Sequence, residues 1–193
     1  MSATGHLLIF SGPSGAGKTT VLRKVLERTN RPLVMSVSAT TRSPRPGETD
    51  GLDYQFLSNT EFQRRREAGE FLECFEVFGR GYWYGTPRST VSSSLEARQW
   101  VVLEIDVQGR ERMVEQFPRA ITFFVRPDSL EVLERRLRQR GTENEESIQR
   151  RLAVARHEWQ FAKQYTYEII NRSIDQTVDE ICQKLELIGE QPT

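Results

Sequence analysis

The chain has 193 residues, and its 27 basic and 27 acidic side chains give a formal net charge of zero at pH 7. This length predicts one domain of ordinary size, and the charge balance excludes a nucleic-acid binder that relies on bulk positive charge. Its longest apolar runs, such as residues 7–10, are far shorter than a membrane-spanning helix. Cys74 and Cys182 lack the spacing of zinc ligands. The sequence leaves open whether a disulfide joins them. Because a chain of this length can fold without a disulfide, two thiols favour a reducing compartment, the cytoplasm.

Short apolar runs alternate with longer segments of helical periodicity along most of the chain. The expected strands are residues 7–10, 33–37, 101–105, 121–125 and 168–170. The expected helices begin near Gly17, Ser129, Asn144 and Asp175, and each carries an apolar stripe. This alternation is typical of an α/β fold in which helices flank a parallel, five-stranded sheet.

Two segments interrupt this rhythm. Residues 38–84 hold a loop rich in proline and glycine at 43–51, a short helix near 60–68 and a strand at 71–78. We interpret them as an insertion with a small mixed α/β fold. In residues 135–151, six arginines cluster around a glycine break, namely Arg135, Arg136, Arg138, Arg140, Arg150 and Arg151.

The strongest chemical signal is the phosphate loop, residues 12–19, which reads Gly-Pro-Ser-Gly-Ala-Gly-Lys-Thr and matches the pattern GxxxxGK[ST]. It lies between an apolar strand and an amphipathic helix, which is the context that the pattern requires. Its glycines let backbone N–H groups approach phosphate oxygens, and Lys18 adds a positive charge. The Thr19 hydroxyl can ligate Mg²⁺. A plain glycine turn is the weaker alternative, so we expect a nucleotide phosphate site.

The insertion carries features of a second anion site. Arg42 and Arg45 stand three residues apart on a loop stiffened by proline, and Tyr54 follows. Such a pair suits a phosphate, because guanidinium groups bind phosphate oxygens through paired hydrogen bonds. The alternative is a loop whose charges face water.

Glu73 is the candidate for recognising a base. On the strand 71–78, the period of two places it on the same face as Phe71 and Phe75. One carboxylate can accept both the N1–H and the exocyclic N–H of guanine, whereas adenine has an unprotonated N1 there. Glu76 on the opposite face is the competing residue, and an exposed strand edge is the alternative without a ligand.

Several motifs then follow one another in the order seen in guanylate kinases, and the chain resembles this family over about residues 7–188. They are the phosphate loop, Ser38-x-x-Thr-Arg42-x-Pro-Arg45-x-Gly-Glu48, Asp53-Tyr54, Gly69-Glu-Phe-Leu-Glu73, Tyr84-Gly-Thr86, Leu103-Glu-Ile-Asp106-x-Gln-Gly109, and Arg140-Gly-Thr with Glu145-Glu146. The resemblance implies a P-loop kinase fold with a core of residues 1–37, 85–134 and 152–193. It also implies a GMP-binding insertion at 38–84 and a helical lid at 135–151. The implied reaction converts ATP and GMP into ADP and GDP.

The same resemblance assigns the site residues. ATP would be bound by Gly12, Pro13, Ser14, Gly15, Ala16, Gly17, Lys18, Thr19, Thr20 and Asn171. GMP would be bound by Ser38, Arg42, Arg45, Tyr54, Glu73, Tyr84, Thr86, Glu104 and Asp106. Lys18, Arg136, Arg140 and Arg151 would reach the transferring phosphates, while the other lid arginines face water. Thr19 would ligate Mg²⁺, with Glu104 acting through a water molecule. Two departures from the family pattern are Trp83 and the pair Arg172-Ser173 after Asn171.

Three other functions fit parts of the pattern. A kinase for AMP or dTMP would use the same scaffold. A guanylate-kinase-like interaction module would bind phosphorylated peptides through Arg42, Arg45 and Tyr54, but such modules typically lose the intact phosphate loop. A GTPase switch is disfavoured because no NKxD-like motif is present. The expected partners are therefore ATP and GMP, with no nucleic acid or membrane, and the expected assembly is a monomer or homodimer.

Overall fold

The computed structural model describes residues 5–76, 81–139, 141 and 144–190. Its central element is a sheet of five strands, all parallel, in the order β2-β7-β1-β8-β9. The strands are β1 (Leu7–Ser11), β2 (Leu33–Met35), β7 (Trp100–Glu104), β8 (Ile121–Arg126) and β9 (Tyr167–Ile170). The predicted α/β fold with a parallel five-stranded sheet is confirmed. β2 ends two residues before the predicted boundary, where the chain turns towards a second sheet.

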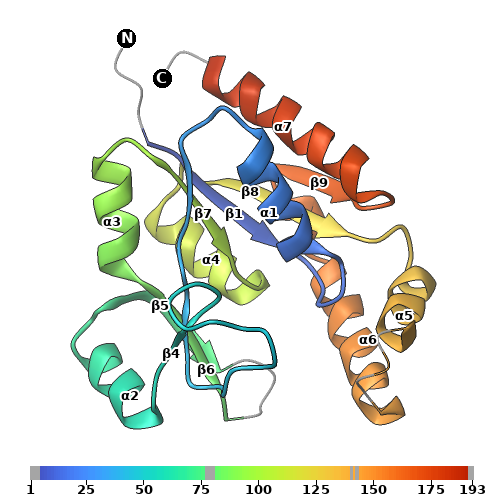
Figure 1. Ribbon diagram of the computed structural model, residues 1–193, viewed down its shortest axis with the longest axis horizontal. Coiled ribbons are helices and arrows are strands. Elements are labelled where there is room, and N and C mark those ends of the chain that lie inside the picture. The colour runs from blue at the N-terminus through green and yellow to red at the C-terminus, as the bar shows by residue number, and fades with distance from the viewer. Residues whose placement is uncertain (1–4, 77–80, 140, 142–143, 191–193) are drawn as a thin grey trace.

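Helices cover both faces of this sheet (Figure 1). α1 (Lys18–Arg28) and α7 (Ile174–Glu190) pack on one face, and α3 (Arg88–Glu96) and α4 (Val107–Gln116) on the other. Successive residues of β1 point to opposite faces, so Leu8 and Phe10 contact the first pair of helices while Leu7 and Ile9 contact the second. A strand buried on both sides needs apolar residues throughout, which explains the unbroken apolar run.

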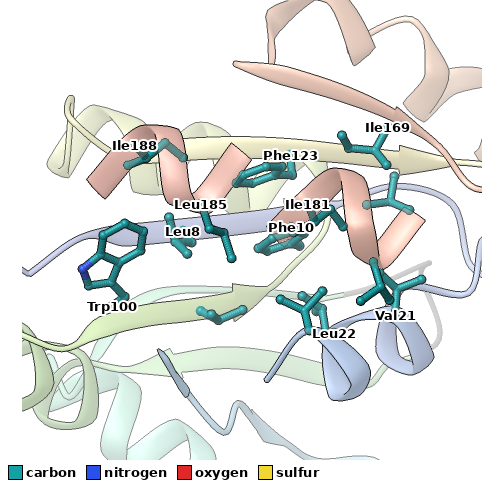
Figure 2. Packing of buried hydrophobic residues seen from close by; sticks show 14 residues of the cluster. Leu8, Phe10, Val21, Leu22, Trp100, Phe123, Ile169, Ile181, Leu185 and Ile188 are labelled. Carbon is teal, nitrogen blue, oxygen red and sulfur yellow. The ribbon is translucent and has the colours of Figure 1, made fainter. Parts of the chain in front are cut away.

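The larger core cluster lies between the sheet and helices α1 and α7 (Figure 2). The rings of Phe10 and Phe123 stack with centroids 4.4 Å apart and planes 3° apart. Ile181 and Leu185 of α7 pack over them, and Val21 of α1 closes the same cluster. This packing fixes the end of β1 and the start of α1, and therefore the phosphate loop between them.

The insertion forms a four-stranded mixed sheet in the order β4-β3-β6-β5. Its elements are β3 (Ala39–Thr40), β4 (Gln55–Phe56), α2 (Asn59–Glu67), β5 (Phe71–Glu76) and β6 (Trp83–Pro87). β6 continues past the predicted boundary at residue 84, because Thr86 and Pro87 still pair with β5. The last part of the predicted strand at 71–78 lies outside the described residues.

Helices α5 (Leu130–Gln139) and α6 (Glu145–Trp159) form a pair with an apolar cluster of their own. The cluster contains Leu133, Leu137, Ile148, Leu152 and Ala155, so it extends beyond both ends of the predicted lid. In Figure 1 this pair and the insertion occupy separate corners below the core sheet. A short 3₁₀ turn, η1 (Ala162–Gln164), leads from α6 to β9. Among the described helices, none is both long and apolar enough to cross a membrane.

Helix α7 offers a matched test of this core. Ile181→Ala removes a fully buried side chain and should lower the free energy of unfolding by about 2–5 kcal/mol. Leu187→Ala truncates a side chain that is 60% exposed on the same helix and should change it by less than about 0.5 kcal/mol. Chemical denaturation of both variants measures the two values, and similar losses would contradict the packing described here.

Candidate active site

The phosphate loop connects β1 to α1 and contains three glycines with positive φ, namely Gly12, Gly15 and Gly17. Gly12 has φ +134°, and a Cβ atom at this position would lie 2.0 Å from the carbonyl oxygen of Val125. Gly17 has φ +90° and caps α1 without a side-chain hydrogen bond. The amides of the first turn of α1 therefore have no side-chain cap, and a helix N-terminus of this kind attracts anions.

Lys18 and Thr19 follow the glycines and face different partners. The Lys18 ammonium donates hydrogen bonds to the carbonyl oxygens of Gly12, at 2.6 Å, and Pro13, at 3.2 Å. The Thr19 hydroxyl lies 3.0 Å from both carboxylate oxygens of Glu104, at the end of β7. A hydroxyl beside a carboxylate supplies the hard oxygen ligands that Mg²⁺ prefers, so these two residues fit the predicted metal site.

One cleft joins the phosphate loop to the insertion and to the carboxyl end of β7. Its lining residues are Gly12, Ser14, Lys18, Ser38, Arg42, Arg45, Tyr54, Glu73, Phe75, Tyr84, Gly85, Glu104, Ile105, Asp106 and Glu158. The two anion sites predicted from separate parts of the sequence therefore open into the same cleft.

Arg42 is held rigidly at the insertion side of the cleft. Its guanidinium forms paired hydrogen bonds of 2.8 and 2.9 Å with Glu48, and its Nε donates to the Tyr84 hydroxyl at 3.1 Å. It also lies over the ring of Tyr54, 5.3 Å from the centroid. Burial alone would lower the pKa of Arg42, but the bonds to Glu48 and Tyr84 outweigh burial and raise it. A fixed cation beside two phenol rings is suited to a phosphate monoester.

Glu73 lies at the other end of the same small sheet. One of its carboxylate oxygens accepts a hydrogen bond from the Thr86 hydroxyl on β6, and the other, Oε2, is buried without a partner among the described residues. Burial raises the pKa of Glu73 to about 7, and the nearby Asp106 acts in the same direction, although the bonds from Thr86 oppose them. A buried acceptor without a donor is costly, so this oxygen is suited to a ligand N–H group.

Asp106 faces the cleft from the start of α4. Its carboxylate caps the helix by accepting a hydrogen bond of 2.8 Å from the amide of Gly109. Burial raises the pKa of Asp106 to about 6, against the opposing effects of these backbone amides and of Lys18. The cap fixes the orientation of the carboxylate at the edge of the cleft.

Comparison with known proteins agrees with this geometry. The sequence model described as guanylate kinase matches residues 4–188. The chain is 54% identical to the guanylate kinase of Rhodopirellula baltica over 94% of this chain and 87% of that one. It is 47% identical to the guanylate kinase of Gloeobacter violaceus, over 93% and 88% of the two chains. The chain belongs to the guanylate kinase family. The crystal structure of guanylate kinase from Anaplasma phagocytophilum matches with a TM-score of 0.81 at 33% identity, over 99% of this chain and 89% of that one.

The guanylate kinase fold brings most of the predicted GMP-binding residues together. Ser38, Arg42, Arg45, Tyr54, Glu73, Tyr84, Glu104 and Asp106 all line the cleft. Thr86 is fully buried behind Glu73 and reaches the cleft through that carboxylate. Glu76, the competing candidate, is exposed and accepts a hydrogen bond of 2.7 Å from the amide of Gly81. The individual roles of these residues stay predictions.

The predicted lid arginines of this guanylate kinase family member occupy three different situations. Arg151 donates to the Ser14 hydroxyl at 2.8 Å, beside the cleft. Arg136 lies on the other side of the phosphate loop, where it donates to the carbonyl oxygens of Asn171, at 2.8 Å, and Ala16, at 3.4 Å. Arg140 lies outside the described residues. The prediction that Arg138 and Arg150 face water agrees with their exposed side chains, which pair with acidic residues of α5 and α6.

The side chain of Asn171 holds the phosphate loop in place by hydrogen bonding. This side chain is 1% exposed, donates to the carbonyl oxygen of Ala16 at 2.7 Å and accepts from the Thr177 hydroxyl at 3.2 Å. Next to Asn171, Arg172 forms an ion pair with Asp128. A shallow hollow lined by Gly15, Gly17, Thr20, Arg136, Gln139, Asn171, Arg172 and Ile174 lies on this side of the loop. The predicted contact of Asn171 with adenine stays a prediction.

Among the charged residues that line the cleft, sequence reasoning missed one, Glu158. It lies near the end of α6 and is 5% exposed, and its Oε2 has no hydrogen-bond partner among the described residues. Burial raises its pKa to about 7, against the opposing effect of Lys18, and Asp106 raises it further. The available signal was an acidic residue within the apolar stripe of α6, in register with Ile148, Leu152 and Ala155.

The raised pKa of Glu73 predicts a pH dependence of stability without ligand. A carboxyl group whose pKa is raised by folding stabilises the fold at low pH, and this contribution is lost as the pH rises through about 7. The free energy of unfolding of the wild type should therefore decline between about pH 5 and 8. Glu73→Gln should remove up to about 3 kcal/mol of this decline. Denaturant titrations at several pH values measure this, and Glu76→Gln should retain the wild-type slope.

Proposed function

We propose that this chain transfers the γ-phosphoryl group of ATP to GMP, giving ADP and GDP. The observation that carries the proposal is the single cleft in which the phosphate loop faces the site around Arg42, Tyr84 and Glu73. Membership of the guanylate kinase family supports it independently.

The insertion would bind GMP at two points. Arg42, Arg45, Tyr54 and Tyr84 hold its phosphate, with Glu48 keeping the guanidinium of Arg42 in place. Glu73 accepts the N1–H and the exocyclic N–H of guanine, and the buried, unpartnered Oε2 supplies the second acceptor. Ser38, Thr86, Glu104 and Asp106 complete the proposed GMP contacts.

ATP would bind along the phosphate loop. Backbone N–H groups of the phosphate loop, other than at Pro13, which has none, and the ammonium of Lys18 hold its phosphates. Asn171 contacts the adenine end from the hollow beside Gly17. Arg136, Arg140 and Arg151 are proposed to reach the transferring phosphates when the lid closes. Ser14 already receives a hydrogen bond from Arg151, which places that guanidinium next to the loop.

The transfer needs no general base. The second pKa of a phosphate monoester is about 6, so the GMP phosphate is largely a dianion at neutral pH. One of its oxygens attacks the γ-phosphorus, the bond from that phosphorus to the β–γ bridging oxygen breaks, and ADP leaves with the electron pair. Catalysis then consists of positioning and charge neutralisation by Lys18 and the lid arginines, together with closure that excludes water.

Thr19 is proposed to ligate Mg²⁺, with Glu104 acting through a water molecule. Their oxygens converge at 3.0 Å, and the remaining ligands of such an ion normally come from water and substrate phosphates. When bound, the ion neutralises phosphate charge. Glu104, which lines the cleft, orients the Thr19 hydroxyl.

The remaining parts of the proposal concern the setting of the enzyme. Cys74 and Cys182 are free thiols, which supports the cytoplasm as the compartment. Small-molecule substrates are the proposed partners, and a monomer or a homodimer is the proposed assembly. A phosphopeptide-binding module is the second candidate, but the complete phosphate loop with Lys18 favours a nucleotide-using enzyme.

The acceptor panel is the direct test. MgATP is incubated with GMP, AMP, dTMP or no acceptor, and ADP formation is measured. We expect turnover with GMP and a rate near background with the others. Lys18→Ala removes the ammonium beside the transferring phosphates and should abolish turnover. Failure with every acceptor by a folded, ATP-binding protein would favour the interaction module instead.

Specificity for guanine tests the role of Glu73. A site built on hydrogen bonds can reject an analogue that lacks the donors by about 10⁴-fold. Glu73→Gln should lower kcat/KM for GMP by roughly 10²-fold or more, because it leaves the guanine donors without a charged acceptor, while ATP binding stays within about threefold. Glu76→Gln is the matched control on the same strand and should behave as wild type. An unchanged preference for GMP in Glu73→Gln would remove Glu73 from this role.

A further inference from the structure

Helix α6 directs two side chains of opposite charge towards the phosphate loop. Arg151 donates to the Ser14 hydroxyl at 2.8 Å, and Glu158 lines the same cleft as Gly12, Ser14 and Lys18. Glu158 lies seven positions after Arg151, which is about two helical turns, so both lie on one face of α6. The small, buried Ala155 lies between them on that face. Helix α6, which begins inside the predicted lid and continues beyond it, therefore places an acid beside the proposed phosphate site.

Glu158 lacks the compensation that a buried carboxylate normally has. It is 5% exposed, Oε2 has no hydrogen-bond partner, and within the described part of the chain no ion pair involves it. By contrast, Asp106 is capped by backbone amides and Glu73 is bonded to Thr86. Burying a carboxylate without such partners is unfavourable, so the charge of Glu158 depends on its few electrostatic neighbours.

Those neighbours come from three elements packed around the end of α6. Lys18 at the phosphate loop favours the charged form of Glu158, whereas Asp106 at the start of α4 disfavours it. The phenol of Tyr165, after η1, lies in the same electrostatic group, and Arg110 of α4 lies over its ring at 4.8 Å from the centroid. Lys18 is therefore the cation that supports a negative Glu158, and its ammonium is otherwise bonded to the carbonyl oxygens of Gly12 and Pro13.

Bound nucleotide phosphates would favour the neutral form of Glu158 over the charged form. They engage Lys18 and bring several negative charges beside the carboxylate, and like charges at short range disfavour ionisation. A neutral carboxylic acid has an O–H donor that a carboxylate lacks, and a phosphate oxygen is a suitable acceptor.

We propose that Glu158 takes up one proton when the phosphates of the donor nucleotide bind at Lys18, and that it positions them as a neutral acid. The proton comes from solvent and joins the carboxylate, no other covalent bond changes, and the proton is released when the nucleotide leaves. Glu158 is thus a positioning residue for the reaction. The inference rests on the proposed function, since it requires the donor nucleotide to bind along residues 12–19.

Proton uptake can be counted directly. The wild-type chain is titrated calorimetrically at pH 7.5 with the Mg²⁺ complex of an ATP analogue whose β–γ bridge is nitrogen, without GMP. Repeating the titration in buffers of different ionisation enthalpy gives the number of protons bound per nucleotide. We expect Glu158→Gln to take up fewer protons than wild type, by roughly half a proton or more. Glu146→Gln, an exposed position on the same helix, should match wild type.

The neutral variants give a second readout. Because glutamine mimics the neutral acid, Glu158→Gln should bind the analogue at least as tightly as wild type at pH 7.5. At pH 8.5 it should bind several-fold tighter, since wild type must first take up a proton. Glu158→Met, a neutral side chain of similar volume, repeats the test if the amide is poorly accommodated.

Two results would overturn the inference. One is an equal proton count in wild type and a neutral variant, and the other is loss of nucleotide binding by neutral variants that circular dichroism shows to be folded. Failure of the proposed function has a different signature, because the wild-type chain itself would then fail to bind the analogue or to phosphorylate GMP.

Discussion

The site depends on the hydrogen bonds that the carbonyl oxygen of Ala16 accepts, because they hold the phosphate loop in place. This oxygen accepts hydrogen bonds from the Asn171 side chain, at 2.7 Å, and from Arg136, at 3.4 Å. Asn171 follows β9 and Arg136 belongs to α5, so a single oxygen connects the phosphate loop, the end of the sheet and helix α5. These hydrogen bonds satisfy the carbonyl of Ala16, and its amide donates to the carbonyl oxygen of Pro13 at 3.0 Å, so both backbone groups of this residue are held in place. The stacked rings of Phe10 and Phe123 support the same loop from the core.

The two ends of the proposed acceptor site are built on opposite principles. At the phosphate end, the cation of Arg42 is already paired with Glu48, so its geometry is fixed before any ligand arrives. At the base end, Glu73 keeps a buried oxygen without a donor, so the site gains a missing hydrogen bond when a ligand binds. In the proposed site, the fixed guanidinium of Arg42 would support affinity for the phosphate. The buried Glu73 oxygen without a donor would support specificity for a base that supplies one.

The sequence predicted the elements that leave a local pattern of residues, and it missed features that depend on packing between distant elements. The core strands were predictable because residues such as Leu8 and Ile9 are buried on opposite faces of one sheet and leave an unbroken apolar run. Helix α3 gave no such signal, since it is rich in serine and buries only Val91. The phosphate loop and the cleft around Arg42 were foreseen from motifs. The direction of Arg136 and the burial of Glu158 were not, because both depend on how α5 and α6 pack against the loop.

Strand β6 carries contacts for both ends of the acceptor site on one stretch of backbone. Tyr84, whose hydroxyl accepts from Arg42, and Thr86, whose hydroxyl donates to Glu73, are two residues apart and therefore project from the same face. Their Cα atoms are separated by about 7 Å, a distance set by the extended chain and held by pairing with β3 and β5. The spacing of these two contacts is therefore set by the backbone of the strand and not by the length of either side chain.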